Sequence, residues 1–221
     1  MRIRRSTPAR DALESAYRYN GSRPVAYLDE TYRIEAGGPT YYVMTAAVVQ
    51  ADQRDLVRAD IQGVVGGSYW HTTESLRTVE GTSKTRELLD YLGEPTGTEA
   101  YLIAHERRVA PGDTDGEGAR ADCLHSLLTH VNSAASPTGP VELFVLERRL
   151  TARMANNDAR TKARLLADGR ITPGTRLYQT SPNDEQLLWL PDLVCSAYRH
   201  QITGRTPDLF PRISAMCTVL P

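Results

Sequence analysis

The run from Thr40 to Val49 constrains the fold of this chain most strongly, because nearly every residue in it is apolar (TYYVMTAAVV). The side chains of a β-strand alternate between the two faces of its sheet, so a strand that is apolar throughout must be covered on both faces. Valine and tyrosine also favour an extended backbone. The run therefore predicts an interior strand with a layer of structure on either side.

A second apolar run, from Val25 to Leu28, precedes it and ends in two adjacent carboxylates, Asp29 and Glu30. The glycines and proline of 36–39 are typical of a turn, so the two runs together predict an antiparallel hairpin. Side chains alternate along a strand, so Asp29 and Glu30 should point to opposite faces, with at most one of them in a given site. A strand that runs out into a solvated turn is the plainer interpretation of this pair.

The remaining periodicity predicts helices that alternate with shorter strands. Helices are expected at 11–19 (capped by Asp11), 52–65, 83–92, 120–134, 157–167 and 184–203, and strands at 100–104, 141–146 and 176–179. Pro191 should kink or divide the last helix, because proline lacks a backbone donor. This order predicts an α/β fold, with a mixed sheet between helical layers.

Length and composition favour one globular domain. We expect a polar, Arg-rich arm at 1–22 and a single domain at 23–221, since 221 residues suffice for a sizeable core. No apolar run approaches the roughly 18 residues needed to cross a membrane. Three scattered cysteines favour a reducing cytoplasm over a disulfide framework. The net charge of −1 does not single out a nucleic-acid-binding protein.

Two further acids, Glu147 and Asp192, follow or interrupt apolar segments, and a buried carboxylate needs a group that neutralises its charge. Glu147 ends the strand predicted at 141–146, and Asp192 lies within a strongly apolar helical segment. Burying one carboxylate alone costs several kcal/mol. An arginine, the capping hydrogen bonds of the helix, or a divalent metal ion shared with the strand acids would each neutralise Asp192. Glu147 is equally compatible with a surface turn.

A basic run follows Glu147. Between 148 and 166 the only acid is Asp158, whereas the basic residues are Arg148, Arg149, Arg153, Arg160, Lys162 and Arg164. A solvated helix face is the default interpretation. A wall that contacts phosphates is the functional one, because Arg and Lys make such contacts.

Several segments resemble one family, the domain of unknown function 3800. The strand ending in Asp29-Glu30 and its hairpin resemble the opening "DES(G)" motif of that family, and residues 186–197 (QLLWLPDLVCSA) resemble its closing "LQxADLVAGA" helix. Trp70 to Glu74 resembles its "ElHasEl"-like stretch, and the strand that ends at Glu147 stands where the family has a strand ending in Asp. The anchors span residues 25 to 200.

The resemblance implies a ribonuclease-H-like fold, in which acids on the first strand, a later strand and a late helix hold magnesium or manganese. It assigns Asp29, Glu147 and Asp192 as metal ligands, with Glu74 as a possible fourth. Hard oxygen ligands suit these ions, and two of them can drive phosphodiester hydrolysis. His71 would move a proton or orient a group, although a hydrogen-bonded loop histidine is the plainer interpretation. The expected function is metal-dependent cleavage of RNA or DNA.

Two alternatives stay open at this point. Glu147 in place of Asp, and Pro191 in place of a small residue, favour a catalytically silent ribonuclease-H-like module that binds nucleic acid or a protein. An α/β enzyme that uses its acids for acid–base chemistry without metal is the other. No GxGxxG, P-loop or GxSxG motif supports a different cofactor or nucleophile.

Overall fold

A computed structural model describes residues 7–35, 40–94, 99–106, 108–136 and 138–220. Its centre is a six-stranded sheet with the order β5-β4-β1-β2-β3-β6. The strands are β1 (Val25–Arg33), β2 (Tyr41–Val49), β3 (Glu99–Glu106), β4 (Leu143–Glu147), β5 (Arg176–Thr180) and β6 (Cys217–Val219). The turn expected at 36–39 lies outside the described residues.

The sheet is mixed, as predicted. β1 pairs with β2 and β2 with β3 in antiparallel fashion. β4 runs parallel to both β1 and β5, and β6 runs parallel to β3. Every residue of β2 is buried, which confirms that this strand is covered on both faces.

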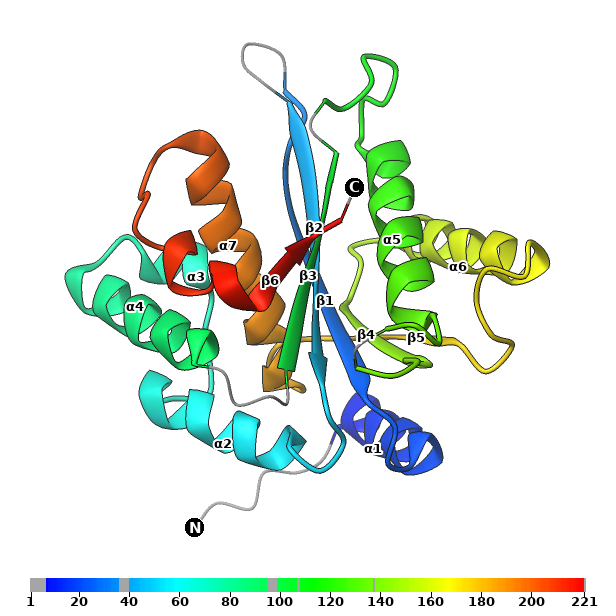
Figure 1. Ribbon diagram of the computed structural model, residues 1–221, viewed down its shortest axis with the longest axis horizontal. Coiled ribbons are helices and arrows are strands. Elements are labelled where there is room, and N and C mark those ends of the chain that lie inside the picture. The colour runs from blue at the N-terminus through cyan, green and yellow to red at the C-terminus, as the bar shows by residue number, and fades with distance from the viewer. Residues whose placement is uncertain (1–6, 36–39, 95–98, 107, 137, 221) are drawn as a thin grey trace.

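Helices cover both faces of the sheet (Figure 1). They are α1 (Pro8–Asn20), α2 (Arg54–Val65), α3 (Thr72–Ser75), α4 (Val79–Gly93), α5 (Glu117–Asn132), α6 (Ala152–Ala167) and α7 (Trp189–Thr203), with short 3₁₀ segments at Gln186–Leu188, Phe210–Arg212 and Ser214–Met216. In Figure 1, α5 and α6 lie on one side of the sheet, and α3, α4 and α7 lie on the other. The predicted α/β class, with helices on both faces, is therefore confirmed.

Two hydrophobic cores show which way each strand residue points. Tyr27 of β1 and Val145 of β4 belong to the core beneath α7. Leu28 and Leu146, one position later, belong to the core beneath α5 and α6. The strand alternation therefore directs the next residues, Asp29 and Glu147, toward the α7 face of the sheet.

Several details differ from the sequence-based expectations: α3 was not expected, and α4 and α6 begin before the expected positions 83 and 157. The helix near the N-terminus begins earlier, its cap is Thr7 instead of Asp11, and its Leu13 and Tyr17 are buried in the α7-side core. Pro191 lies in the first turn of α7, where a helix leaves its backbone N–H groups unpaired, so it starts the helix without kinking it. Strand β6 has no counterpart among the predicted elements.

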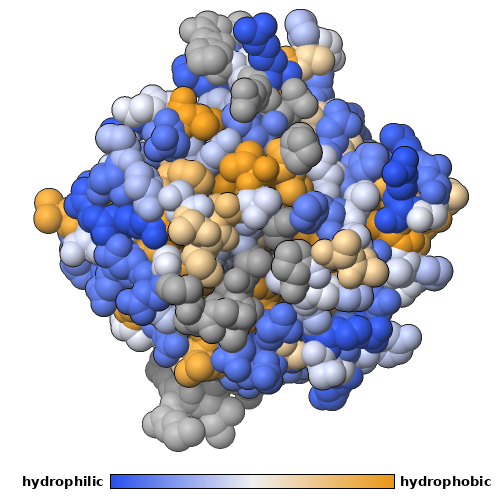
Figure 2. Space-filling model, in the orientation of Figure 1, coloured by the Kyte–Doolittle hydropathy of each residue, from blue (hydrophilic) through white to orange (hydrophobic). Residues whose placement is uncertain are grey.

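Hydrophilic residues cover most of the face seen in Figure 2, and hydrophobic residues form separate patches there. Among the helices that the structure describes, none is both long enough and apolar enough to span a bilayer.

Candidate active site

Two acids lie side by side at the carboxyl ends of parallel strands. The β1–β4 pairing includes Leu28 opposite Leu146, and the next residues along the two strands are Asp29 and Glu147. Both lie on the α7 face, because they continue the alternation of Tyr27 and Val145. Ligands of α/β proteins bind beyond such strand ends, so the position suits a functional site.

A third acid reaches the same place from the helix that packs over the sheet. Asp192 lies in the first turn of α7. Just before it, the Pro191 carbonyl accepts a 2.9 Å hydrogen bond from the buried Thr45 hydroxyl of β2. Thr45 stands opposite Asp29 in the β1–β2 register. One strand hydroxyl thus fixes the start of α7 against the strand that carries Asp29.

Burial and the negative charges in this cluster raise the pKa values of Asp29 and Glu147. Burial raises the pKa of Asp29 well above its ordinary value, and the negative charge of Asp192 raises it further, as do those of Glu30 and Glu147. Burial also raises the pKa of Glu147, followed by the charges of Glu30 and Asp192. Like charges gathered in a partly buried place hold protons more tightly.

Asp192 is held in place by the segment before α3. Its Oδ2 accepts the backbone N–H of Thr72 at 2.8 Å, while Thr72 Oγ1 accepts the Trp70 indole N–H at 3.0 Å. Burial raises the pKa of Asp192, whereas the Thr72 N–H and the charge of His71 act in the opposite direction. The carboxylate is therefore oriented by a backbone donor and is not neutralised by that contact.

The chemistry of this donor set suits a hard cation. No described residue forms an ion pair with Asp29, Glu147 or Asp192, although the charges of His71 and Arg199 lower the pKa of Asp192, which burial raises. Carboxylates that lie this close together without an ion-pair partner favour a bound cation. Within the described part of the chain, however, no three His, Cys, Asp or Glu side chains are arranged so that they could hold a metal ion. Ligation therefore requires a change of side-chain orientation, which Glu147 has room for because it is exposed.

His71 and Glu74 flank the cluster. His71 is exposed, and its charge acts on both Glu147 and Asp192. Glu74 is exposed on α3 and accepts a hydrogen bond from the Tyr69 hydroxyl at 3.1 Å. Burial raises the pKa of Tyr69 first, and then Glu74, Asp192 and Glu147 raise it. Both residues thus lie at the rim of the acid cluster.

Glu30 points to the other face and is neutralised there, as the strand alternation predicts. Its carboxylate lies 2.6 Å from Nη1 of Arg120 and 3.2 Å from Nη1 of Arg149. Arg120 is buried and also binds Asp158 at 2.8 Å, while Arg149 pairs in addition with Glu117. These ion pairs join β1 to α5, α6 and the segment after β4.

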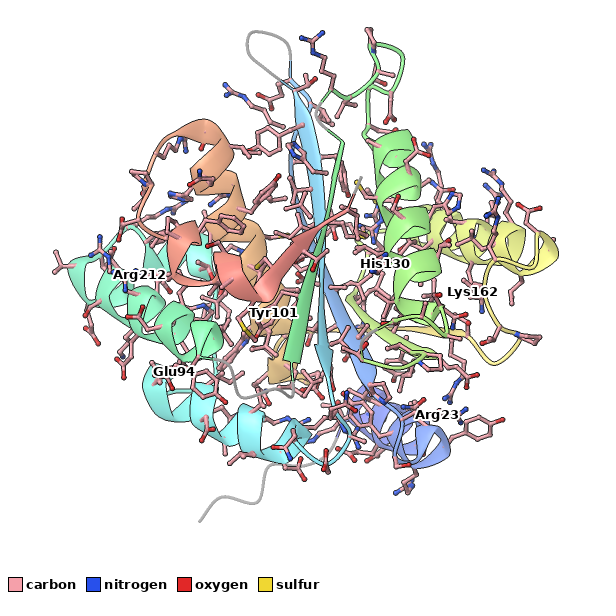
Figure 3. All side chains as sticks on the ribbon, viewed as in Figure 1. Arg23, Glu94, Tyr101, His130, Lys162 and Arg212 are labelled. Carbon is pink, nitrogen blue, oxygen red and sulfur yellow. The ribbon has the colours of Figure 1, made fainter. Side chains whose placement is uncertain are left out.

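The predicted phosphate-contacting residues are therefore not equivalent. The guanidinium of Arg149 is engaged by two acids, and exposed Arg153 pairs with Asp115 at 3.1 Å. Arg148 is exposed directly after Glu147. The other three, on α6, are exposed Arg160, half-buried Lys162 and exposed Arg164. Figure 3 shows Lys162 on α6, across the sheet from α7. Arg148 and Arg149 line a pocket together with Glu147.

Sequence reasoning missed several residues that shape the site. Thr72 holds Asp192 through its backbone N–H, and its side chain also lowers the pKa of that carboxyl group. Cys195 donates to the Asp29 carbonyl at 3.3 Å and lies 3.2 Å from Thr45 Oγ1, which ties α7 to both strands. Buried Arg120 lies in α5, and the expectation of a helix at 120–134 does not show that this arginine is buried. Their roles depend on contacts between distant segments.

No protein-family model matches the chain, and no curated protein sequence matches it, so the resemblance to the domain of unknown function 3800 stays a prediction. Among solved structures, the chain is similar to ribonuclease H2 from Pyrococcus horikoshii OT3, with 13% sequence identity and a TM-score of 0.49, over 84% of this chain and 78% of that chain. The fold class is the predicted α/β one, with a mixed sheet and helices on both faces (Figure 1).

Proposed function

We propose that this protein is a metal-dependent nuclease that hydrolyses phosphodiester bonds at the acid cluster. One observation carries the proposal: Asp29, Glu147 and Asp192 are far apart in sequence, yet, besides burial, the charges of Asp192 and Glu147 raise the pKa of Asp29, and the charge of Asp192 raises that of Glu147. None of the three has an ion-pair partner among the described residues. Such uncompensated groups in a partly buried place are typical of functional sites.

Magnesium or manganese would be held by these three carboxylates, with Glu74 as a possible further ligand. Bound there, the ions would supply positive charge to the phosphate oxygens and lower the pKa of water. The chain itself contributes rigidity: Asp29 is on an interior strand, and the Thr72 N–H orients Asp192. Glu147 is exposed and is free to turn toward an ion.

His71 is placed to move a proton. It is exposed at the rim of the cluster, and its charge acts on Glu147 and Asp192. A histidine in this position would accept a proton from the attacking water or donate one to the leaving oxygen.

The test is a cleavage assay with labelled RNA and DNA, each single-stranded and double-stranded, in the presence of magnesium or manganese. We expect cleavage by the wild type, loss of at least about a hundredfold in Asp29→Asn, and no cleavage without the ions. Asp122→Asn is the matched control, because Asp122 is an exposed acid on α5. Equal cleavage by Asp29→Asn and wild type would refute the proposal.

A catalytically silent module that binds nucleic acid or a protein is the second candidate. It is favoured by the lack, among the described residues, of any three side chains already arranged to hold a metal ion. In that case Asp29→Asn would leave binding intact, and charge reversal in the basic run would abolish it. A strong dependence of affinity on salt would identify the partner as nucleic acid.

A further inference from the structure

A pocket of about 190 Å³ opens on the α5 and α6 side of the sheet, toward which Glu30 and Tyr32 point, and it meets the acid cluster of the other face at Glu147, which forms part of its wall. It lies where β1 continues to Arg33 after its partner β4 has ended at Glu147, so the side of β1 near Tyr32 is not covered by β4. The segment after β4 and the first turn of α6 close the pocket with Leu150 and Met154. Its volume is below the roughly 300 Å³ at which pockets for drug-sized ligands begin, so it suits a small flat group.

An aromatic ring with a fixed orientation lines this pocket. Tyr32 is 52% exposed, although it belongs to a strand, and its ring stacks on that of buried Tyr42. The ring centroids are 5.2 Å apart with 7° between the planes, and the two residues are direct partners in the β1–β2 register. A ring braced on one side and exposed to solvent is prepared to stack on another flat group.

The pocket has one arginine that can contact an anion, next to the carboxylate of Glu147. Glu30 lines the pocket, but Arg120 and Arg149 neutralise it. Arg148 also lines the pocket and is exposed, and it forms no ion pair with any described residue. Its guanidinium is therefore available to a phosphate, since arginine matches phosphate oxygens with a fork of donors.

We propose that this pocket receives one unstacked nucleobase of a single-stranded nucleic acid, with Tyr32 as the stacking platform and Arg148 on a flanking phosphate. The inference rests on the proposed nuclease function, because the neighbouring phosphodiester would then lie at Glu147. A base inside a duplex already has stacking partners on both faces and cannot enter the pocket. Stacking on an aromatic ring tolerates every base, so the pocket selects single strands and not a sequence.

The test is fluorescence anisotropy with a labelled single-stranded 12-mer and the matching duplex, in an Asp29→Asn background to prevent cleavage. We expect Tyr32→Ala to weaken single-strand binding about tenfold or more, and Tyr32→Phe to stay near the parent. Tyr19→Ala is the matched control, because Tyr19 is a 75% exposed tyrosine on α1 that lies outside the pocket. Duplex binding should be weaker and should not respond to Tyr32→Ala.

A second variant tests whether the loss of binding in Tyr32→Ala is caused by misfolding. Leu150 is 93% exposed, so Leu150→Glu leaves the core intact while it places a negative charge at the pocket, and it should also weaken single-strand binding. Parent-like affinity in both Tyr32→Ala and Leu150→Glu, absence of single-strand binding in the parent, or tighter binding of duplex would each overturn the pocket assignment. Wild-type cleavage is measured separately, so the nuclease proposal stands or falls independently of this result.

Discussion

Asp29 and Glu30 are adjacent in sequence but lie in opposite electrostatic environments. Glu30 points toward α5 and α6, where Arg120 and Arg149 neutralise it. Asp29 points toward α7, and its pKa is raised by burial first and then by the charges of Asp192, Glu30 and Glu147. Glu30, which joins the sheet to its helical layer, is thus neutralised by arginines, whereas Asp29 has no ion-pair partner among the described residues.

This contrast separates structural charges from functional ones. An ion pair with good hydrogen bonds keeps buried charges in place, and Arg120 makes such contacts with Asp158 through both Nε and Nη2. A group of carboxylates without an ion-pair partner lowers the stability of the fold, so its retention points to a function. A bound cation would relieve the repulsion on the α7 face, which is why the two faces should respond oppositely to mutation.

The largest change in stability should come from a mutation on the α5 and α6 face of the sheet, where Glu30 is paired with arginines. Arg120→Met removes the buried cation, so Asp158 loses its ion-pair partner and Glu30 keeps only Arg149, and the free energy of unfolding should fall by about 3–5 kcal/mol. Urea denaturation of wild type and variant measures the change. Arg153→Ala is the control, because its ion pair with Asp115 is exposed, and it should cost less than about 1 kcal/mol. Equal small losses in the two variants would break the comparison.

A mutation on the α7 face, where Asp29 has no ion-pair partner, should raise the free energy of unfolding instead of lowering it. Asp29→Asn removes one negative charge from the cluster, so without divalent ions we expect a gain on the order of 1 kcal/mol at pH 7. Thermal or urea unfolding in the presence of a chelator measures the gain. A clear loss of stability would mean that the Asp29 carboxylate has a favourable partner in the fold.

The same contrast should appear as a dependence on pH. The folded state binds the Asp29 proton more tightly than the unfolded state does, so the contribution of Asp29 is most favourable below its ordinary pKa of 3.8 and is lost as pH rises through its raised folded value. The stability of wild type minus that of Asp29→Asn should therefore fall with pH above about 4, by at most about 1.4 kcal/mol per unit. A difference that stays flat or rises between pH 4 and 8 would contradict the uncompensated cluster.

The smallest expected effect is on the affinity for an oligonucleotide, and it depends on which arginines are free to contact phosphates. Arg148→Gln should weaken binding of a single-stranded oligonucleotide a few-fold and lower the salt slope of log K by about one, because Arg148 forms no ion pair with a described residue. Arg153→Gln should change the slope less, since Asp115 already engages that side chain. Affinities measured from 50 to 200 mM salt distinguish the two, and identical slopes would remove the distinction.

Much of the architecture follows from the sequence, because strand and helix periodicity depend on local patterns. The fully apolar β2 predicts an interior strand, and the alternation within β1 predicts that Asp29 and Glu30 diverge. Strand β6 was not predicted: it is three residues long and pairs with β3, more than one hundred positions earlier. Short strands carry little periodicity, and their pairing is set by the rest of the fold.

For the site as well, some features can be predicted from the sequence and others depend on how distant segments pack. The acids themselves stand out in the sequence, since each follows or interrupts an apolar run. What the sequence does not show is which arginines are already neutralised: Arg148 and Arg149 are neighbours, yet two acids engage only Arg149. Their partners come from β1 and α5, so the distinction exists only once the layers pack.

The most direct test of the central claim is a crystal soaked in manganese, with an anomalous difference map calculated around the acid cluster. The account predicts a peak between Asp29, Glu147 and Asp192, with carboxylate oxygens within roughly 2.0–2.3 Å of the ion and Glu147 turned inward. The same soak of Asp29→Asn should show no peak. A wild-type map without density there, or one in which an arginine or lysine side chain fills the space between the three acids, would contradict it.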